Sequence, residues 1–255
     1  MLVLDLDGTL LEPSGLIHPY TSKLLNEVAE RGVMVTIATG RPFSRTLVPL
    51  RVNELYPGSP FPQFLICEER DIYELRDGEF APWPENEEAR AREIELLPLS
   101  HYLLTRLASE IPTLEYAVNN TYSQRTRGFL ELYFVERSEA EEAFRFLVHL
   151  TKDTPLKAVR NGRNVCLRAN FSGKAKALQR LVEREGLEFG KILAVGDSHN
   201  DLDMLTCGVR GATTANADQE IKQAINQLPG YISQANHSLG VGQIIEDCIL
   251  PALSL

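Results

Sequence analysis

The chain has 255 residues, of which 44% are hydrophobic and 24% charged, and its formal net charge is -9. This length suits one large domain or a core with a smaller inserted domain, and the composition is that of a globular protein. The acidic balance argues against general binding to nucleic acids or to acidic membrane surfaces. No apolar run approaches the roughly 18 residues of a membrane span. Asp5 interrupts the N-terminal apolar run, which therefore does not predict a signal peptide.

The cysteines stand far apart in the sequence and match no metal-binding spacing; they are Cys67, Cys166, Cys207 and Cys248. We expect four reduced thiols that mostly fill the core of a cytoplasmic protein. The sequence contains no internal repeat and no low-complexity segment. We expect a monomer or a small homo-oligomer.

An apolar run, Leu2–Leu4, is followed by two carboxylates, Asp5 and Asp7, and then by Gly8-Thr9. The run predicts a buried strand, on which side chains two residues apart point the same way. Both carboxylates are then expected at the carboxyl end of the strand, where open α/β sheets bind ligands. At about 5 Å they would repel by roughly 3 kcal/mol, which a divalent cation or a shared proton would remove. The stretch indicates a hard-metal site with an anionic nucleophile; an Asp-Gly turn is the simpler alternative.

Helix and strand patterns alternate in the next part of the chain. The expected elements are a helix from about Tyr20 to Arg31, a strand at Val33–Ala38, a helix at Ser44–Leu55, a strand at Phe64–Cys67 and a hairpin at Asp71–Phe80. This order predicts a parallel, doubly wound sheet. The second strand ends in Thr39-Gly40-Arg41, whose hydroxyl and backbone N–H groups suit an oxyanion. Taken alone, these residues fit an ordinary turn better.

The pattern changes after Pro82-Trp83-Pro84. The expected elements there are helices over Glu87–Glu110 with a break near Pro98, strands at Tyr116–Tyr122 and Leu130–Val135, a helix to about Thr151, and a hairpin at Ala158–Leu167 that turns at Asn161-Gly162. Ser138 and Glu141 form the expected capping box of the third helix, whose expected buried residues are Phe144, Leu147 and Val148. We infer an α+β insert over residues 84–168, between core segments 1–83 and 169–255.

The first pattern then resumes. The expected elements are a helix from Ser172-Gly173-Lys174 to Gly186, a strand at Ile192–Val195, the segment Gly196–Asp201 leading into Leu202–Leu205, a helix near Glu220–Asn226, a weak strand near Tyr231–Ser233 and a final helix around Val241–Leu250. The predicted fold class is α/β, a doubly wound parallel (Rossmann-like) sheet core with an inserted α+β cap domain.

Chemically useful side chains follow several of the expected core elements: Asp5 and Asp7, Thr39, Lys174, and Asp197 with Asp201. Each has a simpler interpretation alone, Lys174 as a solvated helix residue and Asp201 as a helix N-cap. On a doubly wound sheet all of them can converge in one cleft. Phosphoryl transfer needs this set, because a cation neutralises carboxylate and phosphate together while a hydroxyl and an ammonium hold the phosphoryl oxygens.

In order along the chain, these motifs resemble those of the haloacid dehalogenase (HAD) superfamily, in its Cof-like branch of phosphatases with a large α/β cap. The matching segments are Asp5–Leu10, Ala38–Arg41, Lys174 with Ala177-Leu178, and Gly196–Asp201. The resemblance covers almost the whole chain. The chain departs from the family at Glu68-Glu69-Arg70-Asp71, where Asn-Gly is usual, and at Ala215-Asn216-Ala217, where Gly-Asn-Ala is usual. We expect neither departure to touch the phosphate chemistry, although the first could alter the floor of the cleft.

The resemblance implies that Asp5 is the nucleophile, which forms an aspartyl-phosphate, and that Asp7 protonates the leaving alcohol and then activates water. It also implies a Mg²⁺ cofactor held by the Asp5 carboxylate, the Asp7 backbone carbonyl, Asp197 and Asp201, the last directly or through water. The implied phosphate-binding residues are Thr39, Gly40, Lys174 and Asn200. Lys174 is preferred over Lys176 because the family's lysine stands four residues before Leu178.

The resemblance places substrate choice in the cap, because the core groups meet only phosphate and metal. The polar candidates there are Asn119, Asn120, Arg125, Arg127, Arg160 and Arg163. The expected function is Mg²⁺-dependent hydrolysis of phosphomonoesters of small metabolites, with a sugar phosphate as the family-level expectation.

Three alternatives use overlapping residues. A phosphomutase would use the same aspartyl-phosphate but retain a bisphosphorylated intermediate. A non-catalytic phosphometabolite-binding protein would lack the nucleophile or the acid, yet Asp5 and Asp7 are both present. A signalling receiver combines Asp, Mg²⁺, Thr and Lys, but its phosphorylated Asp ends a later strand, where this chain has Thr39 and Cys67.

Overall fold

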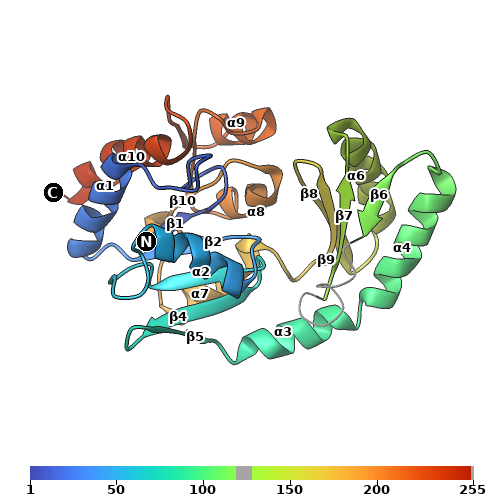
Figure 1. The fold of residues 1–255 in the computed structure, drawn as a ribbon, viewed down its shortest axis with the longest axis horizontal. Coiled ribbons are helices and arrows are strands. Elements are labelled where there is room, and N and C mark those ends of the chain that lie inside the picture. Colours follow the sequence, from blue (N-terminus) through green and yellow to red (C-terminus); the bar gives the residue numbers. More distant parts are fainter. Residues whose placement is uncertain (119–127, 254–255) are drawn as a thin grey trace. The chain divides into compact units, whose positions relative to one another are not determined.

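The computed structural model describes residues 1–118 and 128–253. The chain divides into two compact units (Figure 1), the first formed by Met1–Trp83 with Lys174–Leu255 and the second by Pro84–Gly173. Four of the polar cap candidates, Asn119, Asn120, Arg125 and Arg127, lie outside the described residues, as does the end of the strand expected at Tyr116–Tyr122.

The first unit is built on an eight-stranded sheet in the order β12-β11-β10-β1-β2-β3-β4-β5. The strands are β1 Leu2–Leu4, β2 Val35–Ala38, β3 Phe64–Cys67, β4 Asp71–Arg76, β5 Glu79–Pro82, β10 Leu193–Val195, β11 Arg210–Thr213 and β12 Tyr231–Ile232. Strands from β12 to β3 pair in parallel, and β4 and β5 add an antiparallel hairpin at one edge.

Helices cover both faces of this sheet. They are α1 Pro19–Glu30, α2 Phe43–Val52, α7 Lys174–Arg184, α8 Leu202–Leu205, α9 Gln219–Asn226 and α10 His237–Cys248, with 3-10 turns η2 Phe189–Lys191, η3 His199–Asp201 and η4 Leu250–Leu253. Leu2 and Leu4 of β1 pack into the core shared with α1, α2 and α10, whereas Val3 packs into the core shared with α7, α8 and α9. Burial on both faces explains the uninterrupted apolar runs, and each such side chain contributes roughly 1.5–3 kcal/mol. The predicted doubly wound core is confirmed.

The second unit holds a four-stranded antiparallel sheet in the order β6-β7-β9-β8. Its elements are α3 Glu85–Ile94, α4 Leu97–Glu110, β6 Tyr116–Val118, β7 Leu130–Phe134, α6 Arg137–Thr151, β8 Leu156–Asn161 and β9 Asn164–Ala169. Leu103 and Leu107 of α4 and Leu147 of α6 pack with the inward residues of the sheet into one core. This α+β architecture is the one predicted for the insert.

The sequence does not predict β11. Its residues Arg-Gly-Ala-Thr form a parallel strand between β10 and β12, and the last three are buried. The segment has neither an apolar run nor β-branched side chains throughout, so its strand conformation is set by the neighbouring strands.

Two predictions within the second unit are wrong in detail. The capping box of α6 is formed by Glu136 and Glu139, so the buried stripe becomes Ala140, Ala143, Leu147 and Thr151, with Val148 exposed. In the β8–β9 hairpin Asn161 pairs with Asn164, and the two-residue turn is therefore Gly162-Arg163, with Gly162 at φ 56°.

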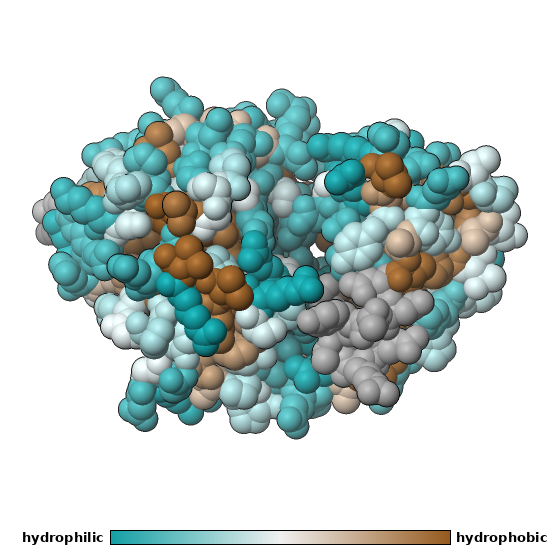
Figure 2. Space-filling model, viewed as in Figure 1, coloured by the Kyte–Doolittle hydropathy of each residue, from teal (hydrophilic) through white to brown (hydrophobic). Residues whose placement is uncertain are grey.

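Hydrophilic residues cover most of the face drawn in Figure 2, and hydrophobic residues form a few separate groups on it. Among the described helices none combines the length and the apolar character that crossing a membrane requires. All four cysteines are free thiols, and Cys67 is buried.

Candidate active site

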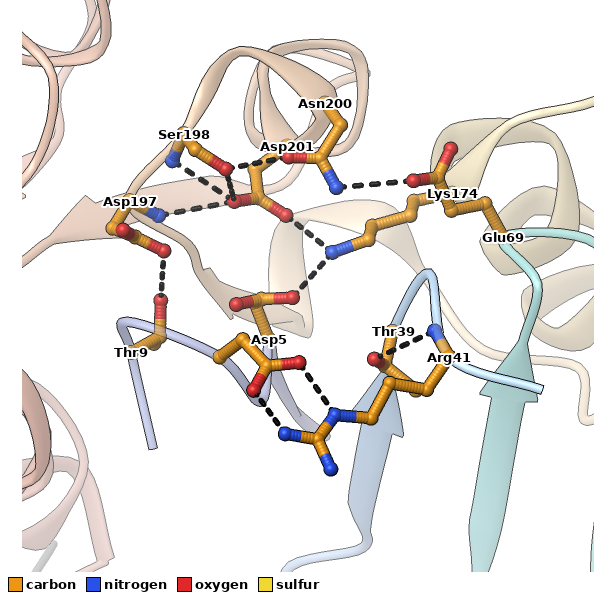
Figure 3. A network of polar contacts seen from close by, with 11 residues as sticks. Asp5, Thr9, Thr39, Arg41, Glu69, Lys174, Asp197, Ser198, Asn200 and Asp201 are labelled. Atoms are coloured by element: carbon orange, nitrogen blue, oxygen red, sulfur yellow. Dashed lines mark hydrogen bonds and ion pairs between the residues drawn. The ribbon is translucent and has the colours of Figure 1, made fainter. Parts of the chain in front are cut away.

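The polar site of the first unit lies where β1, β2, β3 and β10 end. Asp5 follows β1, Thr39 follows β2 and Asp197 stands two residues after β10. Because these strands run parallel, their carboxyl ends meet at one edge of the sheet. The N–H of Asp5 still donates to the Val195 carbonyl at 2.9 Å, which holds the end of β1 against β10. Figure 3 shows the side chains from these segments turned toward one another.

Three carboxylates converge there: Asp5, Asp197 and Asp201 each offer an oxygen within 4.8 Å of the other two. Burial, followed by the charge of Asp201, raises the pKa of Asp5 well above its usual range. The same two causes raise the pKa of Asp197 to about 6. A divalent cation would remove this mutual destabilisation, and carboxylate oxygens are the ligands that hard cations such as Mg²⁺ prefer. The cluster therefore fits a hard metal ion.

Lys174 lies between two of these acids. Its Nζ donates to Oδ1 of Asp5 and to Oδ1 of Asp201, both at 2.5 Å, and its side chain is fully buried. Burial opposes the ammonium charge, but Asp201 and Asp5 outweigh it and raise the pKa of Lys174, which is therefore charged at neutral pH. Lys174 begins α7, whereas Lys176, the alternative lysine of this motif, is exposed.

The loop after β10 is shaped around Asp201. Its Oδ2 accepts the backbone N–H groups of Asp197 at 3.0 Å and Ser198 at 3.1 Å, which forms a capping box at η3. A Cβ on Gly196 would lie 2.5 Å from Cγ of Asp201, so only glycine lets this carboxylate turn back onto the loop. The short Gly-Asp-Ser-His-Asn-Asp segment thus fixes two of the three acids.

The Gly8-Thr9 turn contacts Asp197 from the other side of the chain. Thr9 Oγ1 donates to Oδ1 of Asp197 at 2.8 Å. Gly8 has φ 80°, and a Cβ there would lie 2.4 Å from Oδ2 of Asp197. The Gly8 carbonyl accepts from Nδ2 of Asn216 at 2.8 Å and lies 3.0 Å from Nδ1 of His237. Asn216 therefore supports the Gly8-Thr9 turn beside the carboxylate cluster.

Asp7 lies outside the carboxylate cluster. Since β1 ends at Leu4, the two-residue alternation of a strand does not apply to Asp5 and Asp7, and that part of the sequence argument is wrong. The Asp7 side chain is 52% exposed, and Arg41 binds both of its oxygens, through Nε at 2.7 Å and Nη2 at 2.5 Å. The Thr39-Gly40-Arg41 motif alone does not predict this contact of the Arg41 side chain.

The remaining candidates for phosphate binding, Thr39, Gly40 and Asn200, lie next to the segment that follows β3. Thr39 is buried; its Oγ1 accepts the Arg41 N–H at 3.1 Å, and its carbonyl accepts the Glu69 N–H at 3.0 Å. Asn200 Nδ2 donates to Oε1 of Glu69 at 3.0 Å, and that oxygen lies 3.3 Å from the position of a Cβ on Gly40. Glu69, in the segment that departs from the family pattern, thus contacts Asn200, one of the phosphate-site candidates.

Two polar cap candidates fall within the described residues. Arg160 is buried and donates to the Gly162 carbonyl at 3.1 Å, and Arg163 donates to the Val135 carbonyl at 3.0 Å. Both contacts are made inside the second unit and stabilise the strands and turn around them.

A family model described as haloacid dehalogenase-like hydrolase matches residues 2–55 and 115–245. The chain is 27% identical over 223 residues to a phosphoglycolate phosphatase of Methanopyrus kandleri, covering 88% of this chain and 87% of that protein. It is 27% identical over 265 residues to the 5-amino-6-(5-phospho-D-ribitylamino)uracil phosphatase YcsE of Bacillus subtilis. This match covers 98% of this chain and 96% of that protein.

Solved structures share the fold. The sucrose-phosphatase of Synechocystis sp. PCC6803 superposes with a TM-score of 0.71 at 18% identity, covering 99% of this chain and 97% of that one. A haloacid dehalogenase-like hydrolase from B. subtilis gives a TM-score of 0.69 at 16% identity, covering 97% and 99%.

The chain belongs to the haloacid dehalogenase-like hydrolases, in the Cof-type branch that carries a cap domain. It is an enzyme, a phosphoric monoester hydrolase of the HAD type.

Proposed function

We propose that this phosphatase hydrolyses phosphomonoesters of small metabolites, sugar phosphates foremost, in a Mg²⁺-dependent reaction through an aspartyl-phosphate at Asp5. The observation that carries the proposal is the carboxylate cluster of Asp5, Asp197 and Asp201, with Lys174 bonded to two of its members. Phosphoryl transfer is catalysed largely by positioning and charge stabilisation, and this cluster supplies both a nucleophile and fixed charges.

Asp5 is the nucleophile of the proposed reaction. An oxygen of its carboxylate attacks phosphorus while the bond from phosphorus to the ester oxygen breaks, and Asp7 gives a proton to the leaving alcohol. Water then attacks the phosphoryl group, Asp7 takes the proton of that water, and the carboxylate of Asp5 is restored as phosphate leaves. The ammonium of Lys174 donates to the Asp5 carboxylate at 2.5 Å and favours its ionised form, against burial and the charge of Asp201.

The residues that would hold Mg²⁺ are the Asp5 and Asp197 carboxylates, the Asp7 backbone carbonyl, and Asp201 directly or through water. When bound, the ion supplies positive charge that neutralises carboxylate and phosphoryl oxygens together. The hydroxyl of Thr39, the backbone N–H of Gly40, the ammonium of Lys174 and the amide of Asn200 would hold the phosphoryl oxygens. Thr39 and Asn200 are buried at the same edge of the sheet, which supports their assignment to one phosphate site.

The proposed substrate class rests on the relatives. Their names specify phosphoglycolate, a phosphoribitylamino-uracil and, for the solved structure, sucrose phosphate chemistry. All are small phosphorylated metabolites, two of them polyhydroxylated. We assign the selection among such substrates to the predicted insert, residues 84–168, as the cap.

The test is phosphate release from p-nitrophenyl phosphate and from a panel of phosphorylated metabolites, with Mg²⁺ and after EDTA treatment. We expect release that requires Mg²⁺ and returns when the ion is restored. An isomerised ester without free phosphate would establish the phosphomutase alternative, and binding without turnover would establish a non-catalytic binding protein. Hydrolysis that is unaffected by EDTA would show that the reaction does not require Mg²⁺.

A further inference from the structure

Two buried glutamates directly after β3 have a backbone conformation that favours glycine or asparagine. The φ angles are 52° at Glu68 and 56° at Glu69, and these residues are 5% and 6% exposed. The left-handed conformation is unfavourable for a residue with a long side chain, so it persists only where the surroundings impose it. Such strain next to a polar site indicates that the side chains have a task there.

The backbone of this segment is tied to the loop after β2. The N–H of Glu68 donates to the Arg41 carbonyl at 2.9 Å, and the N–H of Glu69 donates to the Thr39 carbonyl at 3.0 Å. The next residue, Arg70, is buried and donates to Asp71 through Nε at 2.6 Å. These contacts fix the direction in which the Glu69 side chain leaves the chain, and Figure 3 shows its carboxylate turned toward Asn200.

Both ends of the Asn200 amide are engaged. Its Nδ2 donates to Oε1 of Glu69 at 3.0 Å, and its Oδ1 accepts from Ser198 Oγ at 2.5 Å. Because an ionised carboxylate can only accept hydrogen bonds, the amide nitrogen must face Glu69. A glutamine at position 69 could form a hydrogen bond with either the nitrogen or the oxygen of the Asn200 amide. A glycine could form a hydrogen bond with neither. A carboxylate is therefore the group that specifies a single orientation of Asn200.

We propose that Glu69 is a positioning residue of the phosphate site, which fixes the Asn200 amide so that its second N–H is held ready to donate to a phosphoryl oxygen. This inference rests on the proposed function, in which Asn200 contacts the phosphoryl group. The contact joins residues 131 positions apart in the sequence. It gives a function to the Glu68–Asp71 segment, where the chain departs from its family.

The test measures the inhibition constant of inorganic phosphate, with KM and kcat for p-nitrophenyl phosphate, in wild type, Glu69→Gly and Glu69→Gln. Glycine is chosen because it adopts a φ of 56° without strain, so the variant removes the side chain alone. We expect Glu69→Gly to raise the inhibition constant and KM about 3- to 10-fold, the effect of one hydrogen bond, with a smaller change in kcat. Glu69→Gln should recover part of the loss. Glu188→Gln is the matched control, since Glu188 is exposed and pairs with Lys191.

A double-mutant cycle with Asn200→Ala separates positioning from general support of the fold. If Glu69 acts through Asn200, Glu69→Gly raises the inhibition constant in the wild-type background and not in the Asn200→Ala background. The same factor in both backgrounds, or no effect of either single variant, would overturn the inference. Should Glu69→Gly fail to fold, Glu69→Gln in the two backgrounds makes the same comparison. If wild type itself neither hydrolyses esters nor binds phosphate, the proposed function has failed instead.

Discussion

Lys174 is a buried cation whose two contacts within the site are both carboxylates, Asp5 and Asp201. Lys174→Met keeps most of the side-chain volume but leaves two buried carboxylates without the ammonium. We expect the free energy of unfolding to fall by about 3–5 kcal/mol, measured by urea denaturation. Lys191→Met is the control, because the Lys191 side chain is 74% exposed and its removal should change little. A Lys174→Met protein with the wild-type unfolding midpoint would show that the two contacts do not stabilise the fold.

Asp5 carries the covalent chemistry in the proposed reaction. Asp5→Asn keeps the shape of the side chain while removing the nucleophile, so kcat should drop by roughly 10³-fold or more. Stability should not fall, since burial and Asp201 already disfavour the charge of Asp5. The measurements are p-nitrophenyl phosphate turnover and thermal unfolding, with the exposed Asp153→Asn as control. Turnover by Asp5→Asn at the wild-type rate would contradict the assignment of Asp5 as the nucleophile.

The residues of the site divide by how they could be found from sequence. Asp5, Lys174 and Asp197 stand at the ends of recognisable elements, so strand geometry predicts their meeting place. Glu69 and Arg41 could not be found in this way. Their contacts, with Asn200 and Asp7, join residues far apart in sequence and depend on side-chain directions that no local pattern encodes.

At the scale of elements, α1 and α10 pack closely through a glycine. A Cβ on Gly242 would lie 2.7 Å from Cδ1 of Tyr20 and 2.8 Å from Oγ1 of Thr21. Gly242→Ala should therefore push the helices apart and lower the free energy of unfolding by about 1–3 kcal/mol in urea denaturation. Gly190→Ala is the matched control, because nothing lies within 4 Å of a Cβ there. Equal stability of the two variants would contradict this packing.

The elements that sequence predicts best are those with their own hydrophobic pattern. Phe64–Cys67 is an apolar run, and β3 has those bounds. Arg210–Thr213 is the opposite case. A Cβ on Gly211 would lie 2.7 Å from Cδ1 of Ile225 and from the Leu205 carbonyl, so close packing requires glycine where a strand pattern would have an apolar side chain. The conformation of β11 is thus fixed by tertiary contacts.

For the whole molecule, the carboxylate cluster links distant parts of the sequence. Asp5 directly follows β1, and Asp197 and Asp201 stand in the segment after β10, so an ion bound between them would stabilise the folded first unit. At a free Mg²⁺ concentration of about 100 times Kd, mass action adds roughly 2.7 kcal/mol, which corresponds to a rise in Tm of about 5–10 °C. Thermal unfolding with Mg²⁺ and with EDTA measures the shift, and Asp197→Asn should lose most of it. An unchanged Tm in wild type would mean that the acids do not share an ion.

The central claim is that the phosphoryl group passes through Asp5, and the most direct test is to trap it there. Asp7→Asn slows the hydrolysis of the acylphosphate because it removes the base, while the good leaving group of p-nitrophenyl phosphate still lets it form. After acid quenching with Mg²⁺ present, mass spectrometry of the N-terminal peptide should find one added phosphoryl group on Asp5. Release of phosphate by Asp7→Asn with no adduct on Asp5, or an adduct on another residue, would contradict the account.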